Sequence, residues 1–290
     1  EFMLKYNDFF SIAESGFKYN DMKANLTGVP ETLFITLRIR AIETKRPDAA
    51  VKDPYAVEIM EQMEFEESSK NKVSGASQTG TIIRTIILDK IINDFLLENP
   101  QGTVVNLGCG LDARCKRLAL NDCQWFDIDV KETIDVRKQF FEETPNGKMI
   151  AKSMFDYTWM DAVPKDKPAL FISEGVMMYF DEKDIKALFA EIAKRFKSAA
   201  IAFDCISEWA VRNHKRHPDV KKYNAPFKLG IDDSKAIEMW HPGIRIIKEY
   251  NYADYLKNRW PVLMRIAMKL YPPMMKSFRV MHVKLSKHKH

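Results

Sequence analysis

Apolar runs alternate with amphipathic segments through the middle of the chain, between residues 100 and 204. The apolar runs have the length and composition of buried strands and cover residues 103–107, 124–128, 148–152, 168–173 and 199–203. We expect helices from Asp112 onward, over residues 130–143 and over residues 181–197. Strands separated by such helices form right-handed βαβ units, whose parallel sheet is covered on both faces. The pattern therefore predicts an α/β fold.

The region before these strands has a helical pattern. Residues 32–42 are apolar enough for a helix, and Asp53-Pro54 interrupts the chain before a second short helix. From Gly80 onward, apolar residues recur at every fourth position, as one face of a helix requires: Ile83, Ile87, Ile91 and Phe95. We therefore expect an N-terminal helical cap over residues 3–99, followed by a cofactor-binding core over residues 100–204.

The alternation of strands and helices stops after residue 204. Residues 205–250 are polar and suit a lid or substrate insertion. Residues 251–290 are expected to close the sheet, because Phe278–Leu285 alternates between apolar and polar positions as a strand does.

Composition limits the class of protein. The 290 residues are 46% hydrophobic and 29% charged, so the chain can bury a sizeable core without disulfides or structural metal. No apolar run reaches the roughly 18 residues of a membrane span, and no secretion signal is visible. The four cysteines form no CxxC motif and have no metal-type spacing with histidine. We expect reduced thiols, no metal site and a cytoplasmic location.

The net charge of +5 is unevenly distributed. Residues 258–290 hold eight Lys and Arg and no Asp or Glu, so the remaining chain carries −3. Such a segment could meet nucleic acid, an anionic membrane or an acidic substrate, or it could be a solvated face. No nucleic-acid-binding motif accompanies it, so nucleic acid is not an expected partner. The segment 262–271, with Arg265 and Lys269, fits either a membrane-surface helix or a helix packed on the core.

A glycine turn follows the first predicted core strand, at VVNLGCGLD over residues 104–112. Open α/β sheets bind cofactors at this position. With Ala113 the turn also matches G-x-G-x-x-A, a weak dinucleotide fingerprint, with Asp127 or Asp129 near the acidic ribose position. However, Asp112 lies where a pyrophosphate would sit and would repel it. S-adenosylmethionine (SAM), which has no phosphates and carries positive charge, suffers no such penalty.

Three further residues extend this constellation. Asp129 ends the second strand, where its carboxylate could accept both ribose hydroxyls or merely cap the next helix. Glu174 ends an apolar strand and needs a cationic or hydrogen-bonding partner, because an unpaired buried carboxylate is costly. Arg84 interrupts the isoleucine-rich helix. Its guanidinium could bind a carboxylate in a bidentate manner, or it could be solvated on the flank of the helix.

Six ordered blocks of the sequence resemble one protein family. They read LTGVPETLFITLRIRAIETKRPDAAVKDPYA at 26–56, GTIIRT at 80–85, VVNLGCGLDAR at 104–114, FDIDV at 126–130, FDYTWMD at 155–161 and ISEGVMMYF at 172–180. Together they resemble the leucine carboxyl methyltransferase family, and within it the bacterial branch that includes polyketide-type O-methyltransferases. The resemblance covers roughly residues 26–200.

The resemblance implies a Rossmann-like class I SAM-dependent methyltransferase with an N-terminal helical cap and a lid. Position by position, Arg84 matches the arginine that holds the SAM carboxylate, and Gly108 the glycine that lets the backbone approach the cofactor. Asp129 matches the ribose-binding acid, and Glu174 the acid that faces the methionine part of SAM.

The resemblance is less close at three positions. Ser153 and Met154 stand where the family usually has Asp-Leu beside the adenine, so the charged hydrogen bond is lost there. Met154 or Phe155 can still supply an apolar wall. Arg40 matches a basic position near the cofactor only loosely.

The sequence therefore predicts a SAM-dependent O-methyltransferase acting on a small, carboxylic-acid acceptor. Three alternatives stay open: methylation of a phenol or other hydroxyl, an NAD-dependent oxidoreductase using the same glycine turn, and a cofactor-binding regulator. A hydroxyl acceptor would need a general base, for which His214, His217 and His241 of the predicted lid are candidates. Each of them could equally be a surface histidine. The sequence leaves the oligomeric state open.

Overall fold

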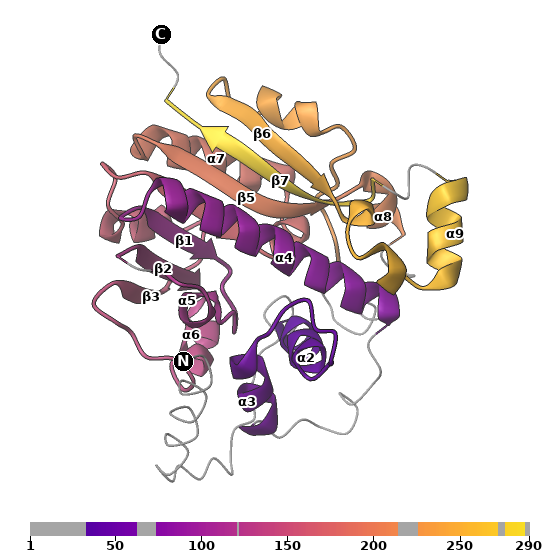
Figure 1. Ribbon diagram of the computed structural model, residues 1–290. Coiled ribbons are helices and arrows are strands. Elements are labelled where there is room, and N and C mark those ends of the chain that lie inside the picture. The colour runs from indigo at the N-terminus through magenta and orange to yellow at the C-terminus, as the bar shows by residue number, and fades with distance from the viewer. Residues whose placement is uncertain (1–32, 63–73, 121, 214–225, 272–275, 288–290) are drawn as a thin grey trace.

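One mixed sheet organises the molecule, as the computed structural model in Figure 1 shows. The structure describes residues 33–62, 74–120, 122–213, 226–271 and 276–287. Within them the strand order is β3-β2-β1-β4-β5-β7-β6. The strands are β1 Thr103–Leu107, β2 Gln124–Asp129, β3 Gly147–Ala151, β4 Ala169–Ser173, β5 Ala199–Ile206, β6 Ile244–Asn251 and β7 Phe278–Leu285. The first five are parallel, and β7 runs antiparallel to both neighbours.

The five predicted core strands and the closing strand are confirmed, with bounds that shift by at most three residues. Every residue of β1 and β4 is buried, because helices and loops cover both faces of the sheet. The helices are α2 Leu33–Thr44, α3 Pro54–Gln62, α4 Gly75–Glu98, α5 Arg114–Arg117, α6 Lys131–Arg137, α7 Glu182–Arg195, α8 Glu208–Arg212 and α9 Val262–Leu270. Short 3₁₀ turns lie between them: η4 Tyr157–Ala162, η5 Met177–Tyr179, η7 Ser234–Met239, η8 Tyr252–Asp254 and η9 Lys257–Arg259.

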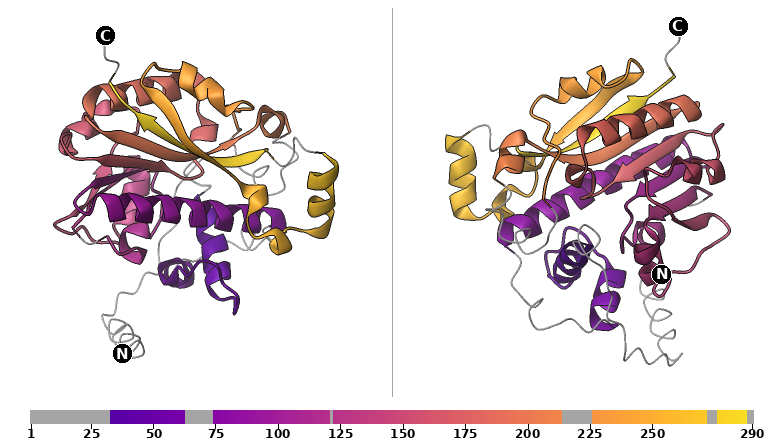
Figure 2. Two further views of the ribbon diagram at one scale, coloured as in Figure 1. Left: turned by 45° about the horizontal axis from the view of Figure 1, so that its top comes forward. Right: turned by 180° about the vertical axis from the view of Figure 1, so that it is seen from behind.

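The long helix α4 covers one face of the sheet, as Figure 2 shows from two further directions. It begins five residues before the expected Gly80, because the Ser74 hydroxyl caps it by accepting from the backbone N–H of Ser77 (3.2 Å). Its isoleucine stripe packs against the sheet and against Tyr252 and Trp260 from the C-terminal region.

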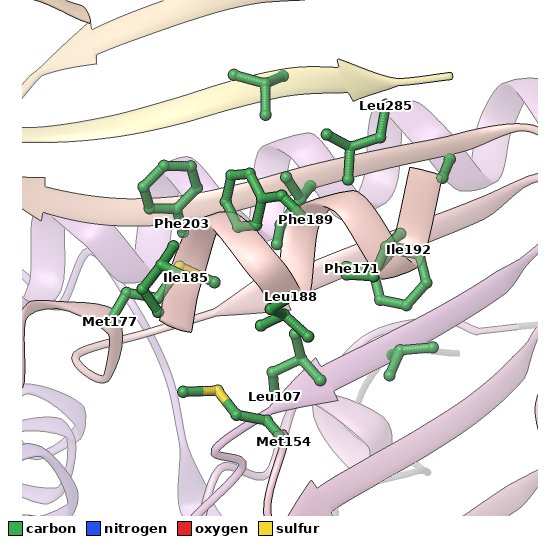
Figure 3. Close-up of a cluster of buried hydrophobic side chains, with 14 of the residues drawn as sticks. Leu107, Met154, Phe171, Met177, Ile185, Leu188, Phe189, Ile192, Phe203 and Leu285 are labelled. Atoms are coloured by element: carbon green, nitrogen blue, oxygen red, sulfur yellow. The ribbon is translucent and has the colours of Figure 1, made fainter. Parts of the chain in front are cut away.

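Helix α7 covers the other face of the sheet. Its apolar residues recur at helical spacing, so Ile185, Leu188 and Phe189 all reach the sheet. Figure 3 shows them packed between Phe203 of β5 and Leu107 of β1. This core extends to the carboxyl end of β1, where the glycine turn begins.

Two predicted helices are shorter than expected. The helix expected over residues 130–143 ends at Arg137, and α5 has only four residues. Arg137 turns inward to pair with Asp127, and Phe141 folds back under the Arg137 guanidinium at 4.4 Å. The helix therefore ends at Arg137, and the following residues fold over the buried Arg137–Asp127 ion pair.

The range 205–250, expected to be a lid or insertion, contains part of the sheet. Strand β5 continues to Ile206, and β6 forms the edge beyond β7. The sequence of β6 lacks a clear strand pattern. Only Ile244 and Tyr250 of its residues are buried, and a register shift occurs between Ile246 and Lys248. Among the described residues, no helix is long and apolar enough to cross a membrane.

Candidate functional site

A cavity of about 150 Å³ lies at the carboxyl ends of β1, β2 and β4, where a parallel sheet binds its ligands. Helix α2 contributes the opposite wall. Five of the six residues predicted to bind the cofactor line this cavity: Gly108, Asp129, Ser153, Met154 and Glu174. The sixth, Arg84, lies behind Glu174 and outside the lining. Of these five, Gly108 and Glu174 are 66 residues apart in the sequence, and the fold brings both to one cavity.

The glycine turn has a left-handed backbone, with φ of +69° at Gly108 and +50° at Gly110. The backbone N–H of Gly108 donates to Ile128 O (2.8 Å), which ties the turn to β2. A Cβ on Gly108 would lie 2.6 Å from Val176 Cγ2. Glycine is therefore required here both by the backbone conformation and by close contact with the loop after β4.

Asp129 is held by backbone amides. Its Oδ2 accepts from Gly110 N and its Oδ1 from Val130 N, each at 2.8 Å. Burial raises the pKa of Asp129 above its usual value, although these two hydrogen bonds act in the opposite direction. No described cation forms an ion pair with it. The interpretation of Asp129 as a simple helix cap is wrong, because Val130 occupies the N-cap position of α6.

Asp127, two residues earlier on β2, has a different environment. It is buried, and its Oδ2 accepts from Arg137 Nη2 at 2.6 Å. Its Oδ1 accepts from Trp125 Nε1 (2.8 Å) and from Asn106 Nδ2 (3.2 Å). Protein groups therefore occupy both oxygens, and Asp127 does not line the cavity.

Glu174 has the cationic partners that its burial requires, as predicted. Its Oε1 accepts from Arg84 Nε at 3.0 Å, and its Oε2 pairs with Arg114 Nη2. Burial alone would raise the pKa of Glu174, but the charges of Arg114 and Arg84 outweigh burial and lower it. Glu174 is therefore ionised at neutral pH.

Arg84 is not a solvated flank. From α4 its guanidinium reaches Glu174 through Nε and Asp204 through Nη1, both at 3.0 Å. Its side chain is only 12% exposed. Its Nη2 has no hydrogen-bond partner among the described residues and lies 2.8 Å from where a Cβ on Gly175 would be. The left-handed Gly175 (φ +72°) thus leaves space for this nitrogen.

Arg114 is the central residue among those that sequence reasoning did not assign at this site; the others in its ion-pair cluster are Asp89, Arg117 and Asp204. Arg114 is fully buried at the start of α5 and forms three ion pairs. Its Nε pairs with Asp89 and its Nη1 with Asp112, both at 2.7 Å, and its Nη2 pairs with Glu174. The signal in the sequence was indirect, since Glu174 was expected to be buried and to need a cationic or hydrogen-bonding partner.

The position of Asp112 corrects one sequence argument. Burial would raise its pKa, but the charges of Arg114, Arg40 and Arg117 outweigh burial and lower it. Asp112 is thus ionised but paired, and does not act as the free negative charge that was expected to repel a pyrophosphate.

The ion pairs below the cavity form one connected cluster, here called the Arg114 cluster. Its carboxylates are Asp89, Asp112, Glu174 and Asp204, and its guanidiniums are Arg84, Arg114 and Arg117. Four carboxylates against three guanidiniums leave one negative charge, and Asp129 adds another at the opposite end of the cavity. The cavity therefore favours a ligand with positive charge.

The part of the cavity wall that follows β3 is mostly apolar. Met154 is buried in the core and also lines the cavity. Ser153 lines it too, and its hydroxyl accepts from Phe155 N at 3.3 Å. Phe155 stacks edge-on against Phe180, with ring centroids 4.8 Å apart. This wall suits a flat aromatic ring with few charged contacts.

Arg40 of α2 also lines the cavity, beside the apolar Leu33. Its Nε pairs with Asp53 at 2.9 Å and its Nη2 donates to Leu111 O at 3.2 Å. The loosely matched basic position is thus occupied by a side chain fixed at the cavity wall.

Of the three histidine candidates, the structure describes only His241, which lies away from the cavity. His241 lies just before β6, at the end of the sheet where β5 begins, which is opposite to the cavity. Its Nδ1 accepts from Gly243 N at 3.0 Å. The hypothesis of His241 as a lid base is therefore wrong, while His214 and His217 lie outside the described residues.

SAM fits the groups that line this cavity. Asp129 uses one lone pair of each oxygen for backbone amides, so a carboxylate lone pair remains for each of two ribose hydroxyls. The surplus negative charge suits a sulfonium and an ammonium, whereas a dinucleotide would bring two further negative charges. Among the described residues, no group of His, Cys, Asp and Glu could hold a metal ion.

Comparisons with known proteins agree with this geometry. Two solved structures share the fold at 12% sequence identity each: a DUF574 family protein from Streptomyces avermitilis and a SAM-dependent methyltransferase from Anabaena variabilis. The first has a TM-score of 0.54 and covers 87% of this chain and 97% of its own. The second has a TM-score of 0.50 and covers 92% and 100%.

Two curated relatives are more similar in sequence. The tetracenomycin polyketide synthesis O-methyltransferase TcmP of Streptomyces glaucescens is 30% identical over 82% of this chain and 88% of its own length. The SAM-dependent methyltransferase dpfgK of Gibberella zeae is 26% identical over 80% and 85%. The family model for leucine carboxyl methyltransferases matches residues 34–193. Fold, cavity and sequence thus agree that the chain is a SAM-dependent methyltransferase, and it belongs to the leucine carboxyl methyltransferase family.

Proposed function

We propose that the protein methylates a carboxylate oxygen of a small, largely apolar acid. The acceptor oxygen attacks the methyl carbon, the carbon–sulfur bond breaks with its electron pair going to sulfur, and the products are a methyl ester and S-adenosylhomocysteine (SAH). When bound, SAM supplies the electrophilic methyl group. The protein's task is to align the acceptor with that group and to exclude water.

Four contacts of the chain would hold the cofactor. Asp129 would accept the two ribose hydroxyls, and Glu174 would face the ammonium group of the methionine part. The unpartnered Nη2 of Arg84 would donate to the methionine carboxylate, reaching past Gly175. Ser153 and Met154 would contact the adenine. Support comes from the negative surplus at Asp129 and Glu174 and from the apolar wall that follows β3.

The observation that carries the acceptor class is the pairing of a fixed cation with apolar neighbours at one wall. Arg40 lines the cavity beside Leu33, and Val176 and Phe180 line it further along. Arg40 already pairs with Asp53 through Nε, but a guanidinium has further N–H donors that can orient a carboxylate, while the apolar side chains contact the rest of the acid. A carboxylic acid with a pKa near ~4 is already ionised at neutral pH, so it needs no general base. The family description itself names a carboxyl group.

The second candidate is O-methylation of a phenol or another hydroxyl. TcmP is named an O-methyltransferase of polyketide synthesis, which leaves this acceptor class open. A phenol with a pKa near ~10 would need a base to become a nucleophile. His214 and His217 stay candidates for that base.

Methyl-labelled SAM, incubated with pairs of aromatic acids and phenols of the same carbon skeleton, tests the proposal. We expect label in the acid of each pair, and release of that label as methanol under mild alkali, because a methyl ester hydrolyses and a methyl ether does not. The rate should stay nearly flat from about pH 6 to 9. Alkali-stable label in the phenols, with a rate that rises through one pKa and collapses in His214→Ala or His217→Ala, would assign the hydroxyl acceptor instead.

A further inference from the structure

Helix α9 carries the most exposed apolar face of the described structure. Leu263 is 82% exposed and Leu270 79%, and Val262 and Ile266 are exposed as well. At 100° per residue these four side chains fall within an arc of about 100° on the helix surface. Single exposed apolar residues are common on proteins, but a continuous apolar stripe marks an interaction surface.

A basic stripe adjoins this apolar arc. Arg265 and Lys269 are exposed one turn apart, on the flank next to Val262. Neither forms an ion pair among the described residues, and no Asp or Glu follows Asp254 in the chain. The third side of the helix holds Met264 and Met268, which pack against the core under α4. The helix is thus anchored on one side and presents the other two sides outward.

The position of α9 places this surface at the cavity end of the molecule. Figures 1 and 2 show α9 at the periphery, beside the end of α4 that begins at Gly75. A Cβ on Gly75 would lie 3.5 Å from Pro261, the residue before α9. Further along α4, Arg84 reaches Glu174 at the carboxyl end of β4. The apolar stripe of α9 and the cavity therefore both lie toward the carboxyl ends of the parallel strands.

We propose that α9 docks on the surface of an anionic lipid bilayer. The apolar stripe would enter the boundary between headgroups and acyl chains, and Arg265 and Lys269 would lie at the level of the phosphates. This combination of an aliphatic face and a flanking cationic face is what interfacial helices use. Charge complementarity favours lipid over a second copy of the chain. A twofold contact would set two basic stripes side by side, with no acid on the helix to compensate.

Sedimentation with vesicles tests the proposal on the full-length protein. The vesicles contain phosphatidylcholine alone, or equal parts of phosphatidylcholine and phosphatidylglycerol. We expect binding to the anionic vesicles that weakens as salt is added, and little binding to the neutral ones. Leu263→Gln with Leu270→Gln should weaken anionic binding at least about tenfold, because it removes the apolar anchor. Arg265→Gln with Lys269→Gln should weaken it about thirtyfold.

Matched control variants separate α9 from general surface effects. Leu97→Gln changes a leucine that is 81% exposed at the other end of α4, and it should leave vesicle binding unchanged. Lys183→Gln with Lys197→Gln removes two exposed charges near α7 and should reduce binding less than twofold. Circular dichroism confirms that each variant folds, and the charge variant preserves every buried residue.

Three results would overturn the proposal. The first is absence of binding to anionic vesicles at low salt. The second is an equal loss of binding in the α9 variants and in the control variants. The third is a dimer in light scattering without lipid that Leu263→Gln with Leu270→Gln converts to a monomer. In that case the stripe is an interface between copies.

Discussion

The two ends of the cavity both present a carboxylate, but the protein holds the two in opposite ways. At one end, Asp129 is bound by two backbone amides, and burial raises its pKa. At the other end, Glu174 is bound by two arginines, and their charges lower its pKa. The first carboxylate keeps lone pairs free for neutral hydroxyl donors. The second belongs to a charged cluster that stays ionised and can balance a cation.

This difference shows that the partners of a carboxylate, and not its place at a strand end, decide what it can do. Asp127 makes the same point, because it lies only two residues from Asp129 and has both oxygens occupied by Trp125, Asn106 and Arg137. Four variants or conditions test the contrast between the two ends.

The largest effect is expected from Arg114→Met at the Glu174 end. The variant leaves Asp112 and Glu174 buried without their shared cation, which should lower the free energy of unfolding by about 3–5 kcal/mol. Urea denaturation followed by circular dichroism measures it. Arg117→Met is the matched control and should cost clearly less, because within the described part of the chain Arg117 pairs only with Asp89, which keeps its ion pair with Arg114. Equal costs would contradict a central role for Arg114.

The next effect is expected at the other end, from Asp129→Asn. Loss of the charged acceptor should weaken SAH binding by roughly 1–3 kcal/mol, measured by calorimetry, while the fold survives. Asp127→Asn is the matched comparison. It should lower stability instead, since Arg137 loses its buried partner, and leave SAH binding nearly unchanged. If both variants bind SAH as the wild type does, Asp129 has no role in the site.

A smaller effect is expected from pH. Because burial raises the pKa of Asp129, this carboxyl takes up its proton at a higher pH than an ordinary aspartate does. Affinity for SAH should therefore be constant near neutral pH and decline in acid, where Asp129, the proposed ribose acceptor, loses its charge. Calorimetry at several pH values measures it. Asp129→Asn should lack this step, and an identical decline in the variant would place the titration elsewhere.

The smallest effect is expected from Arg84→Lys. A lysine keeps the charge but cannot reach Glu174 and Asp204 while also donating past Gly175. We expect SAH binding to weaken by about 1 kcal/mol, or roughly fivefold. Unchanged affinity would mean that Arg84 only neutralises the acids around it.

Sequence alone determined the elements whose signal is local. The core strands, the glycine turn and the closing strand follow from apolar periodicity and from residues that few backbones tolerate, such as Gly108. The six blocks were sufficient to identify the family. Glu174 could also be expected to have a cationic partner, because the cost of an unpaired buried charge is general.

Tertiary structure alone decided which groups pair. Arg114 and Glu174 are 60 residues apart, and Arg84 and Asp204 are 120 apart, so no local pattern links them. The same holds for β6, whose half-exposed residues form a strand because they pair with the edge of β7. It also holds for His241, which precedes β6 and therefore lies at the end of the sheet opposite to the cavity. The sequence shows which side chains can carry a charge, but the pKa and the binding role of each depend on neighbours that only folding brings within hydrogen-bonding distance.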